Sequence, residues 1–153
     1  MPIRALLMDI DDTLFDFQTS SRNALSIAFR ALNLPFTPEM WAHYRELDAE
    51  FWQRFERGEI TKEALYVERF RVFFAEYGLE ADPAAFNTAY FCELGAQRNF
   101  MPHCEQALRQ LHAQYKIFIV TNGNTEIQKR RIAASGMAPV SYTHLRAHET
   151  AAN

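Results

Sequence analysis

The chain has few cysteines and no long hydrophobic segment. Its 153 residues include two cysteines, Cys92 and Cys104, which are too few for a disulfide framework. Both lie in apolar helical patterns, so we expect them to be reduced side chains in the core. A membrane-spanning helix needs about 20 consecutive apolar residues, and no segment approaches that length. No signal peptide precedes Ile3, and we expect a cytoplasmic protein without a membrane partner.

The sequence also lacks an excess of positive charge. The net charge is −3 and the pI is about 5.9. Proteins that bind nucleic-acid polymers usually present a basic surface, so we do not expect such a polymer as a partner. The one short basic run, Lys129, Arg130 and Arg131, is typical of the solvated face of a helix. With 48% hydrophobic residues, the chain can bury the core of one domain with an insertion.

What the chain does have is a pair of acids directly after an apolar strand. The apolar run 3–8 predicts a strand, and Asp9 and Asp11 follow it at a spacing of two. Side chains two apart on a strand point to the same side. Open α/β sheets carry their chemistry at the carboxyl ends of their strands, so this position indicates a catalytic site.

Two carboxyl groups at this position can divide one reaction between them. We expect Asp9 to attack phosphorus as a nucleophile and Asp11 to serve as the acid and base. Because two carboxylates would repel an anionic phosphate, the site needs a hard cation, and we expect Mg²⁺. The Asp9 carboxylate and the Asp11 backbone carbonyl are the expected metal ligands.

Two other interpretations of the acidic segment remain. A calcium-binding EF-hand loop also begins Asp-x-Asp, but it requires Gly at its sixth position and Glu at its twelfth, where this chain has Leu14 and Ser20. Alternatively, Asp11, Asp12 and Thr13 only form the turn that ends a strand.

A second apolar strand ends in residues suited to an anion. The run 116–120 is rich in β-branched residues and is followed by Thr121, Asn122 and Gly123. A hydroxyl group and successive backbone N–H groups before a helix bind anions, although Asn-Gly is also a common turn signal. We expect Thr121, Asn122 and Gly123, together with Asp12, to bind the phosphate.

These two segments resemble the motifs of the haloacid dehalogenase (HAD) superfamily. The first motif is similar to residues 9–14, and the second to residues 119–123. Asp12 stands where many members carry Gly. The dehalogenase branch lacks an acid at the position of Asp11, so the resemblance implies phosphate monoester hydrolysis. It also implies an α/β fold, a Rossmannoid parallel sheet with an inserted α-helical cap.

The segment between the motifs resembles the bacterial pyrimidine 5′-nucleotidases of this superfamily. The similarity lies in residues 16–18, 51–63, 69–70 and 77–78. It implies a small phosphomonoester substrate, a nucleoside monophosphate. A sugar-phosphate phosphatase or a phosphoglucomutase-like phosphotransferase would use the same Asp9 and Asp11, and a non-catalytic scaffold could retain the fold.

The middle of the chain predicts four helices. We expect a first from Ser20 or Ser21 to Asn33, a second capped by Thr37, a third from Thr61 to Gly78, and a fourth from Asp82-Pro83. These form the predicted cap, 16–98, between two parts of a core domain, 1–15 and 99–139. Two further helices are expected, one from Met101-Pro102 with Ala107, Leu108 and Leu111 facing inward, and one over 125–135 that stops at Gly136. The aromatic residues of the cap are expected to pack its interior rather than to stack on a base.

The last residues depart from the family pattern. Residues 140–153 resemble the translated sequence of an adapter used in DNA library preparation. We therefore predict that native sequence stops near Pro139, which leaves an incomplete sheet without the phosphate-binding lysine and distal acid of the family. The 153-residue chain is expected to be nearly inactive. Alternatively, the segment is a genuine short helix or a disordered end. In a helix, His144 and His148, with Glu149 beside them, could bind a metal, although a third ligand is missing.

Overall fold

The computed structural model describes residues 3–137 and 142–143, and the predictions for the rest of the tail lie outside these residues. The chain forms two compact units, Met1–Asn23 with Leu94–Asn153, and Ala24–Glu93. The first boundary falls inside helix α1 (Phe17–Ala31). The predicted role of 16–98 as a cap stays a prediction, and each unit is described by itself below.

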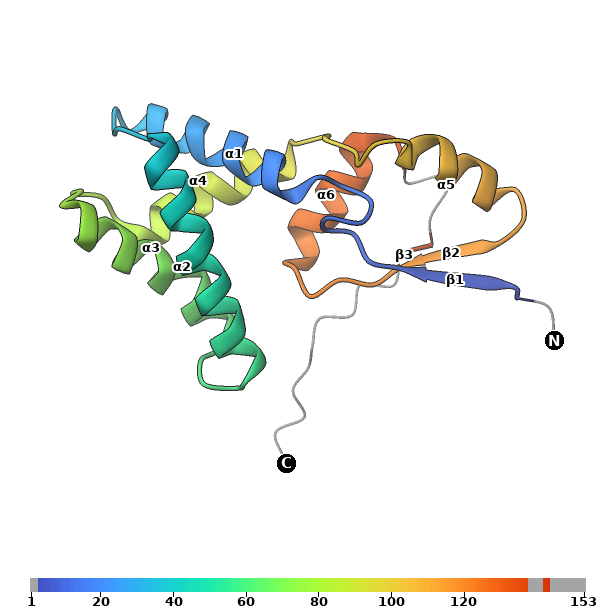
Figure 1. Ribbon diagram of the computed structural model, residues 1–153, viewed down its shortest axis with the longest axis horizontal. Coiled ribbons are helices and arrows are strands. Elements are labelled where there is room, and N and C mark those ends of the chain that lie inside the picture. The colour runs from blue at the N-terminus through green and yellow to red at the C-terminus, as the bar shows by residue number, and fades with distance from the viewer. Residues whose placement is uncertain (1–2, 138–141, 144–153) are drawn as a thin grey trace. The chain divides into compact units, whose positions relative to one another are not determined.

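The first unit contains a small parallel sheet. Its strands are β1 (Ala5–Met8), β2 (Lys116–Ile119) and β3 (Tyr142–Thr143), in the order β1-β2-β3 (Figure 1). Met8 pairs with Ile119, so β1 and β2 end at the same edge. Thr143 also pairs with Ile119, from the other side of β2. Both predicted strands are confirmed, and the parallel arrangement agrees with an incomplete α/β core.

One face of this sheet packs against the unit's own helices, α5 (Cys104–His112) and α6 (Thr125–Ser135). The buried side chains that form this core are Ile10, Leu14, Phe15, Cys104, Leu108, Ile117, Ile119, Ile132 and Met137. Side chains on the other face are exposed, with Leu7 at 75% and Val120 at 37%. Parallel sheets are normally covered on both faces, so the described residues form only part of such a core.

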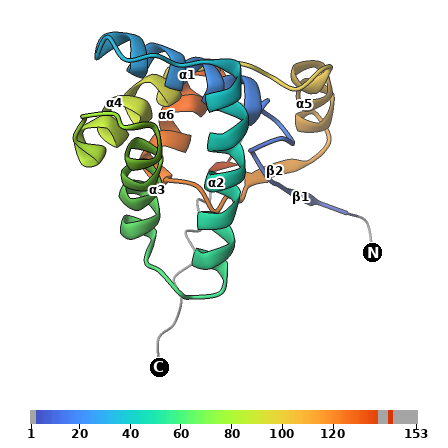
Figure 2. The same cartoon turned by 60° about the vertical axis from the view of Figure 1, so that its left-hand side comes forward.

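The second unit is helical. It contains the end of α1, then α2 (Pro38–Glu56), α3 (Lys62–Tyr77) and most of α4 (Pro83–Gly95). Helices α2 and α3 lie side by side in both views (Figures 1 and 2). Thr37 caps α2 by accepting a hydrogen bond from the Met40 amide, and Thr61 caps α3 in the same way through Ala64. The cap at Thr37 was predicted, as were the start of α3 at Thr61 and its end at Gly78, which has a φ of 61°.

Aromatic side chains fill the interior of this helical unit. The buried aromatic residues are Phe29, Tyr44, Phe51, Phe70, Phe73, Phe74, Phe86 and Tyr90. Their rings meet in edge-on and stacked pairs, such as Phe29 with Phe86 at 4.7 Å between centroids. The prediction that the aromatic stripes pack a core is confirmed for these residues. A buried ion pair between Arg69 and Asp48 lies among them.

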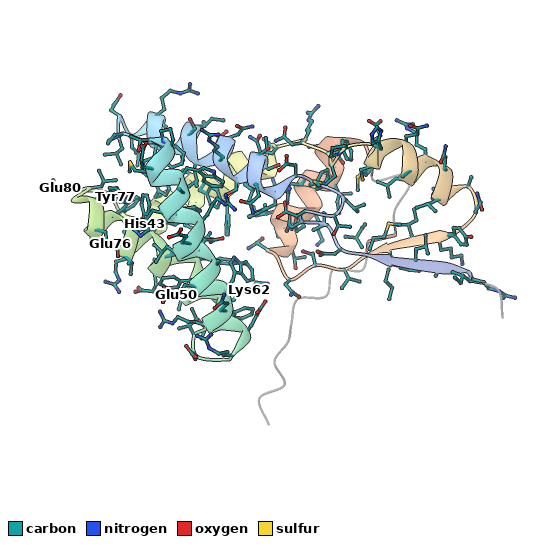
Figure 3. The ribbon with its side chains drawn as sticks, viewed as in Figure 1. His43, Glu50, Lys62, Glu76, Tyr77 and Glu80 are labelled. Atoms are coloured by element: carbon teal, nitrogen blue, oxygen red, sulfur yellow. The ribbon has the colours of Figure 1, made fainter. Side chains whose placement is uncertain are left out.

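The outer surface of this unit carries a different polar group. Nε2 of His43 on α2 lies 3.4 Å from Oε2 of Glu76 on α3, and its Nδ1 lies 3.1 Å from the Tyr77 hydroxyl (Figure 3). The His43 and Glu76 side chains are 38% and 46% exposed. Exposed pairs of this kind contribute little to stability.

No helix among residues 3–137 is long and apolar enough to cross a membrane.

Four details correct the sequence prediction, namely the starts of two helices and the exposure of Ala107 and of Cys92. Helix α1 begins at Phe17, before the predicted Ser20 or Ser21, because the Asp16 carboxylate accepts hydrogen bonds from the amide and the hydroxyl of Thr19.

Helix α5 begins at Cys104, after the predicted Met101-Pro102, because His103 has a left-handed backbone with a φ of 62°. Its residue Ala107 is exposed, whereas Leu108 is buried as predicted. Cys104 is buried as predicted, but Cys92 is exposed, because it lies on an outer face of α4.

Candidate active site

The ends of β1 and β2 bring the two predicted motifs together. The backbone N–H of Val120 donates to the carbonyl oxygen of Met8 at 2.9 Å, which extends the parallel pairing by one residue. The next residues along each strand are Asp9 and Thr121. The acidic segment and the predicted anion site therefore lie next to each other at one sheet edge, as the sequence predicts.

The two acids of the first motif have different environments. Asp9 is exposed, and its carboxylate has no hydrogen bond or ion pair within the described part of the chain. The Asp11 side chain is 29% exposed and is held by two groups on α6. Its Oδ2 accepts a hydrogen bond of 2.6 Å from Nε2 of Gln128, and its Oδ1 forms an ion pair of 2.5 Å with Nη1 of Arg131. The Asp9 carboxylate is thus accessible, while that of Asp11 is held in place.

Burial raises the pKa of Asp11 above its ordinary value of 3.8. The ion pair and hydrogen bond from Arg131 and the hydrogen bond from Gln128 act against this rise, and the nearby charge of Asp9 adds to it. Burial therefore favours the protonated form of Asp11, which a general acid needs, whereas the ion pair with Arg131 favours its charged form.

Arg131 corrects the interpretation of the basic run. Its side chain is 1% exposed, and its guanidinium carbon lies 4.8 Å from the centre of the Phe15 ring. The prediction of a solvated face is wrong for this residue, because the charge is balanced by Asp11. Lys129, by contrast, is exposed and pairs with Glu126 on the same helix.

Gln128 was not identified from the sequence, although α6 carries a signal for it. Gln128, Arg131 and Ile132 are spaced at i, i+3 and i+4, which places them on one helix face. All three are buried, at 3%, 1% and 3% exposure. An apolar residue on the same face indicates that the two polar side chains point inward and need partners there.

Thr121 and Gly123 form the part of the site contributed by β2. Thr121 is 4% exposed, and its hydroxyl oxygen accepts hydrogen bonds from the Gly123 amide at 3.1 Å and from Nε2 of Gln128 at 3.3 Å. A Cβ atom on Gly123 would lie 2.6 Å from Nε2 of Gln128, so any larger residue here would force this bonded side chain to shift. Asn122 is exposed. The next residue, Asn124, caps α6 by accepting hydrogen bonds from the amides of Glu126 and Ile127.

Asp12 is occupied by contacts within its own loop. Its carboxylate accepts a hydrogen bond of 2.8 Å from the Phe17 amide at the start of α1, and its own amide donates to the Phe15 carbonyl. Its φ of 55° is in the left-handed region, which agrees with the glycine that many HAD members carry at this position. The predicted contact of Asp12 with phosphate stays a prediction.

The donor atoms at this edge fit a magnesium ion. Mg²⁺ prefers oxygen ligands and usually keeps several waters, so one or two protein ligands suffice. The exposed carboxylate of Asp9 and the backbone carbonyl of Asp11 are such ligands. The part of the chain that the structure describes contains no group of three or more His, Cys, Asp or Glu side chains that could hold a metal.

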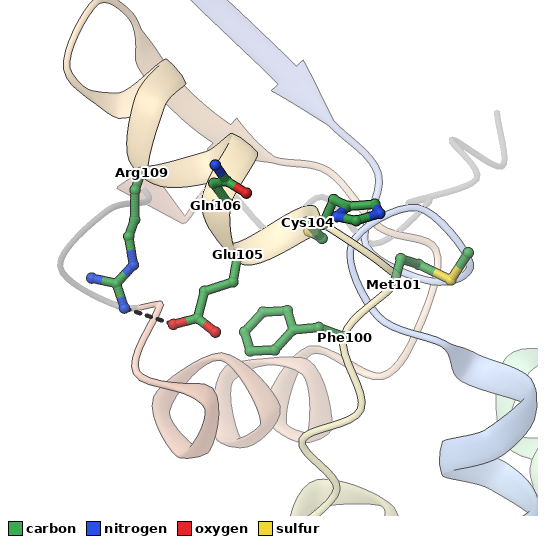
Figure 4. Close-up of a pocket in the computed structure, with 7 residues that line it drawn as sticks. Phe100, Met101, Cys104, Glu105, Gln106 and Arg109 are labelled. Atoms are coloured by element: carbon green, nitrogen blue, oxygen red, sulfur yellow. Dashed lines mark hydrogen bonds and ion pairs between the residues drawn. The ribbon is translucent and has the colours of Figure 1, made fainter.

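A separate pocket of about 410 Å³ lies at the start of α5 (Figure 4). Phe100, Met101 and the first turn of α5 line it, and Glu105 and Arg109 form an ion pair beside it. It contains none of the predicted site residues, and its charged side chains are already paired with each other.

Comparisons with known proteins agree with this geometry. The family model of the haloacid dehalogenase-like hydrolases matches residues 3–150. The HAD-hydrolase YfnB of Bacillus subtilis is 36% identical over 138 residues, which are 89% of this chain and 58% of that protein. The pyrimidine 5′-nucleotidase PynA of Streptococcus pneumoniae is 29% identical, over 88% of this chain and 57% of PynA. The pyrimidine 5′-nucleotidase YjjG of Escherichia coli is 28% identical, over 86% of this chain and 57% of YjjG.

Solved structures show the same fold. A crystal structure of YfnB bound to magnesium matches with a TM-score of 0.88 and 32% identity, over 95% of this chain and 65% of that one. The L-2-haloacid dehalogenase of Xanthobacter autotrophicus matches with a TM-score of 0.69 at 21% identity, which shows the fold alone. The chain spans little more than half the length of the three curated relatives. On the match of its family model, this chain belongs to the haloacid dehalogenase-like hydrolases.

Proposed function

We propose that the protein is a Mg²⁺-dependent phosphate monoester hydrolase that acts through an aspartyl-phosphate at Asp9, with pyrimidine nucleoside 5′-monophosphates as substrates. The observation that carries this proposal is the side chain of Gln128, which donates to both Asp11 and Thr121. One amide nitrogen thus joins the predicted acid to the predicted phosphate-binding hydroxyl. Two relatives named as pyrimidine 5′-nucleotidases support the substrate class.

The reaction would proceed in two displacements. An Asp9 carboxylate oxygen attacks phosphorus, the bond from phosphorus to the ester oxygen breaks, and Asp11 gives its proton to the leaving oxygen. Asp11 then accepts a proton from water, whose oxygen attacks phosphorus and releases phosphate from Asp9. The Thr121 hydroxyl and the backbone of Asn122 and Gly123 bind the phosphoryl oxygens.

Magnesium would be held by the Asp9 carboxylate and the Asp11 backbone carbonyl. When bound, it would neutralise part of the negative charge that the phosphate brings to Asp9. Without it, Asp9 and the phosphate repel each other. Removing the metal with a chelator should therefore stop hydrolysis, and restoring Mg²⁺ should recover it.

The activity is proposed for the native-length protein, meaning the reading frame that continues past Pro139 in an independently sequenced copy of the gene. Residues 140–153 are proposed to be non-native, as their resemblance to adapter sequence indicates. The 153-residue chain would lack the lysine and the distal acid expected in the family, and we expect it to hydrolyse phosphate esters poorly. A native lysine-bearing segment after Gly136 would support this part of the proposal, and the same tail in independent DNA would refute it.

The test is a substrate panel. Native-length protein with Mg²⁺ should release phosphate from pyrimidine nucleoside 5′-monophosphates faster than from purine nucleotides or sugar phosphates. The Asp9→Asn and Asp11→Asn variants should lose turnover and keep the fold. Faster hydrolysis of sugar phosphates would refute the proposed substrate class and indicate a sugar-phosphate phosphatase. Transfer of phosphate to an added sugar would indicate a phosphotransferase. Full activity of Asp9→Asn would refute the nucleophile.

A further inference from the structure

We propose that Gln128 and Arg131 are positioning residues, which together set the orientation of Asp11 relative to Thr121 for proton transfer to the leaving group. This inference rests on the proposed function, because it concerns the acid of that same reaction. It assigns a role to two side chains of α6, a helix that contributes no reacting group.

The contacts form a closed network. Nη1 of Arg131 donates to Oδ1 of Asp11 and, at 3.0 Å, to Oε1 of Gln128. The Gln128 amide nitrogen then donates to Oδ2 of Asp11 and to Oγ1 of Thr121. Because its oxygen faces Arg131, the Gln128 amide cannot turn over without losing its contacts with both Asp11 and Arg131.

Arg131 itself is held by its surroundings. Its guanidinium carbon lies 4.8 Å from the centre of the Phe15 ring and 5.9 Å from that of Phe17. Its Nε and Nη2 atoms have no hydrogen-bond partner among residues 3–137. A buried guanidinium with so few partners is stabilised mainly by Asp11, so the ion pair holds both side chains in place.

Both carboxylate oxygens of Asp11 accept one hydrogen bond each in this network. A carboxylate offers about four lone-pair sites, so each oxygen keeps one that is open to a proton or a ligand. The 29% exposed part of the side chain is the part that a substrate can reach. The network therefore leaves Asp11 able to transfer a proton while preventing rotation of its carboxyl plane.

The test compares two leaving groups in the native-length protein. A nucleoside monophosphate releases a strongly basic alkoxide that needs a proton, whereas para-nitrophenyl phosphate releases a stable phenolate that does not. Gln128→Met keeps the length of the side chain and removes its donors. Hydrolysis of the aspartyl-phosphate is common to both substrates, so the rate of leaving-group release is measured within the first turnover. We expect this rate to fall about tenfold to a hundredfold for uridine 5′-monophosphate and to change less than about threefold for para-nitrophenyl phosphate.

Other variants serve as controls. Lys129→Met, on the exposed face of the same helix, should leave both rates unchanged. Arg131→Met removes the charge and should lower the rate with uridine 5′-monophosphate. Arg131→Lys keeps the charge but cannot reach both Asp11 and Gln128 equally well, so its rate should lie between those of Arg131→Met and the wild type. Equal losses with both substrates would overturn the positioning role. No hydrolysis of either substrate by the wild type would overturn the proposed function and the inference together.

A second measurement uses the 153-residue chain and needs no activity. A double-mutant cycle of Asp11→Asn and Gln128→Met, followed by urea unfolding, reports whether the two side chains interact. We expect the combined change in the unfolding equilibrium constant to differ by about tenfold from the product of the single changes. A double-mutant change equal to the product of the single changes, which means additive free energies, would overturn the network whatever the kinetics show.

Discussion

Asp11 and Arg131 are 120 positions apart in the chain, and their side chains form an ion pair of 2.5 Å. Asp11 follows the first strand of the sheet, and Arg131 lies on the last helix that the structure describes. Because the pair is largely buried, α6 cannot shift without moving the carboxyl group of Asp11 or separating two charges. The position of the acid therefore depends on a helix that begins after the second motif.

The Gly123→Ala substitution tests how tightly this region is packed. The added Cβ would lie 2.6 Å from Nε2 of Gln128 and 3.3 Å from Oγ1 of Thr121. The Gln128 side chain is buried and bonded to Asp11, so it cannot move aside freely. We expect a loss of about 1–3 kcal/mol in the free energy of unfolding, and lower kcat in the native-length protein.

Gly95→Ala is the matched control for that substitution. Its Cβ would meet the flexible side chain of Arg130, with Nε at 3.2 Å. Because Arg130 can adjust, urea unfolding should show a much smaller change than for Gly123→Ala. Equal effects of the two substitutions would contradict the close packing at Gly123.

The buried pair of Arg69 and Asp48 should govern the stability of the helical unit. Arg69 is 2% exposed and Asp48 is 9% exposed. Asp48→Asn keeps the shape and removes the charge, which leaves the arginine uncompensated among aromatic rings. We expect it to lower the free energy of unfolding by about 3–5 kcal/mol. Glu68→Gln breaks the exposed pair with Arg71 and should have no measurable effect in the same urea titration.

The start of α1 should make stability depend on pH. The hydrogen bonds from the Thr19 hydroxyl and then its amide lower the pKa of Asp16 below its ordinary value of 3.8. A lowered pKa in the folded state means that the unfolded chain takes up the proton first, so this stabilisation is present above about pH 4 and is lost as the pH falls through the folded pKa.

Asp16→Asn removes that titration and retains an oxygen that can accept from Thr19. The variant should therefore lose less stability than the wild type between neutral and acid pH, as measured by urea unfolding at several pH values. Thr19→Val removes the hydroxyl donor and should weaken the pH dependence in the same direction. Identical pH profiles for all three proteins would show that Asp16 does not act in this way.

Much of the fold follows from local sequence signals. Thr37 and Thr61 cap helices because their hydroxyl groups satisfy amides within the next turn, and Gly78 and Gly136 end helices because glycine adopts a left-handed backbone easily. The ends of the two strands could also be predicted, because the polar residues Asp9 and Thr121 directly follow apolar runs. Each of these signals depends on neighbours close along the chain.

The partner of Arg131, and with it the burial of this charge, could not be predicted in the same way. Locally, Lys129, Arg130 and Arg131 form a run of charges that is typical of an exposed helix face. The partner that makes burial of Arg131 favourable is Asp11, at the far end of the sequence. Only the pairing of β1 with β2, which brings α6 beside the first motif, provides that partner. Exposure of Cys92 likewise depends on which face of α4 packs inward.

Asp9 should become phosphorylated during each turnover. The most direct measurement mixes native-length protein with uridine 5′-monophosphate and Mg²⁺, stops the reaction with acid within one turnover, and locates phosphate by peptide mass spectrometry. We expect a phosphoryl group on Asp9 that is absent in Asp9→Asn. Phosphate on another residue, or rapid hydrolysis that persists in Asp9→Asn, would contradict it.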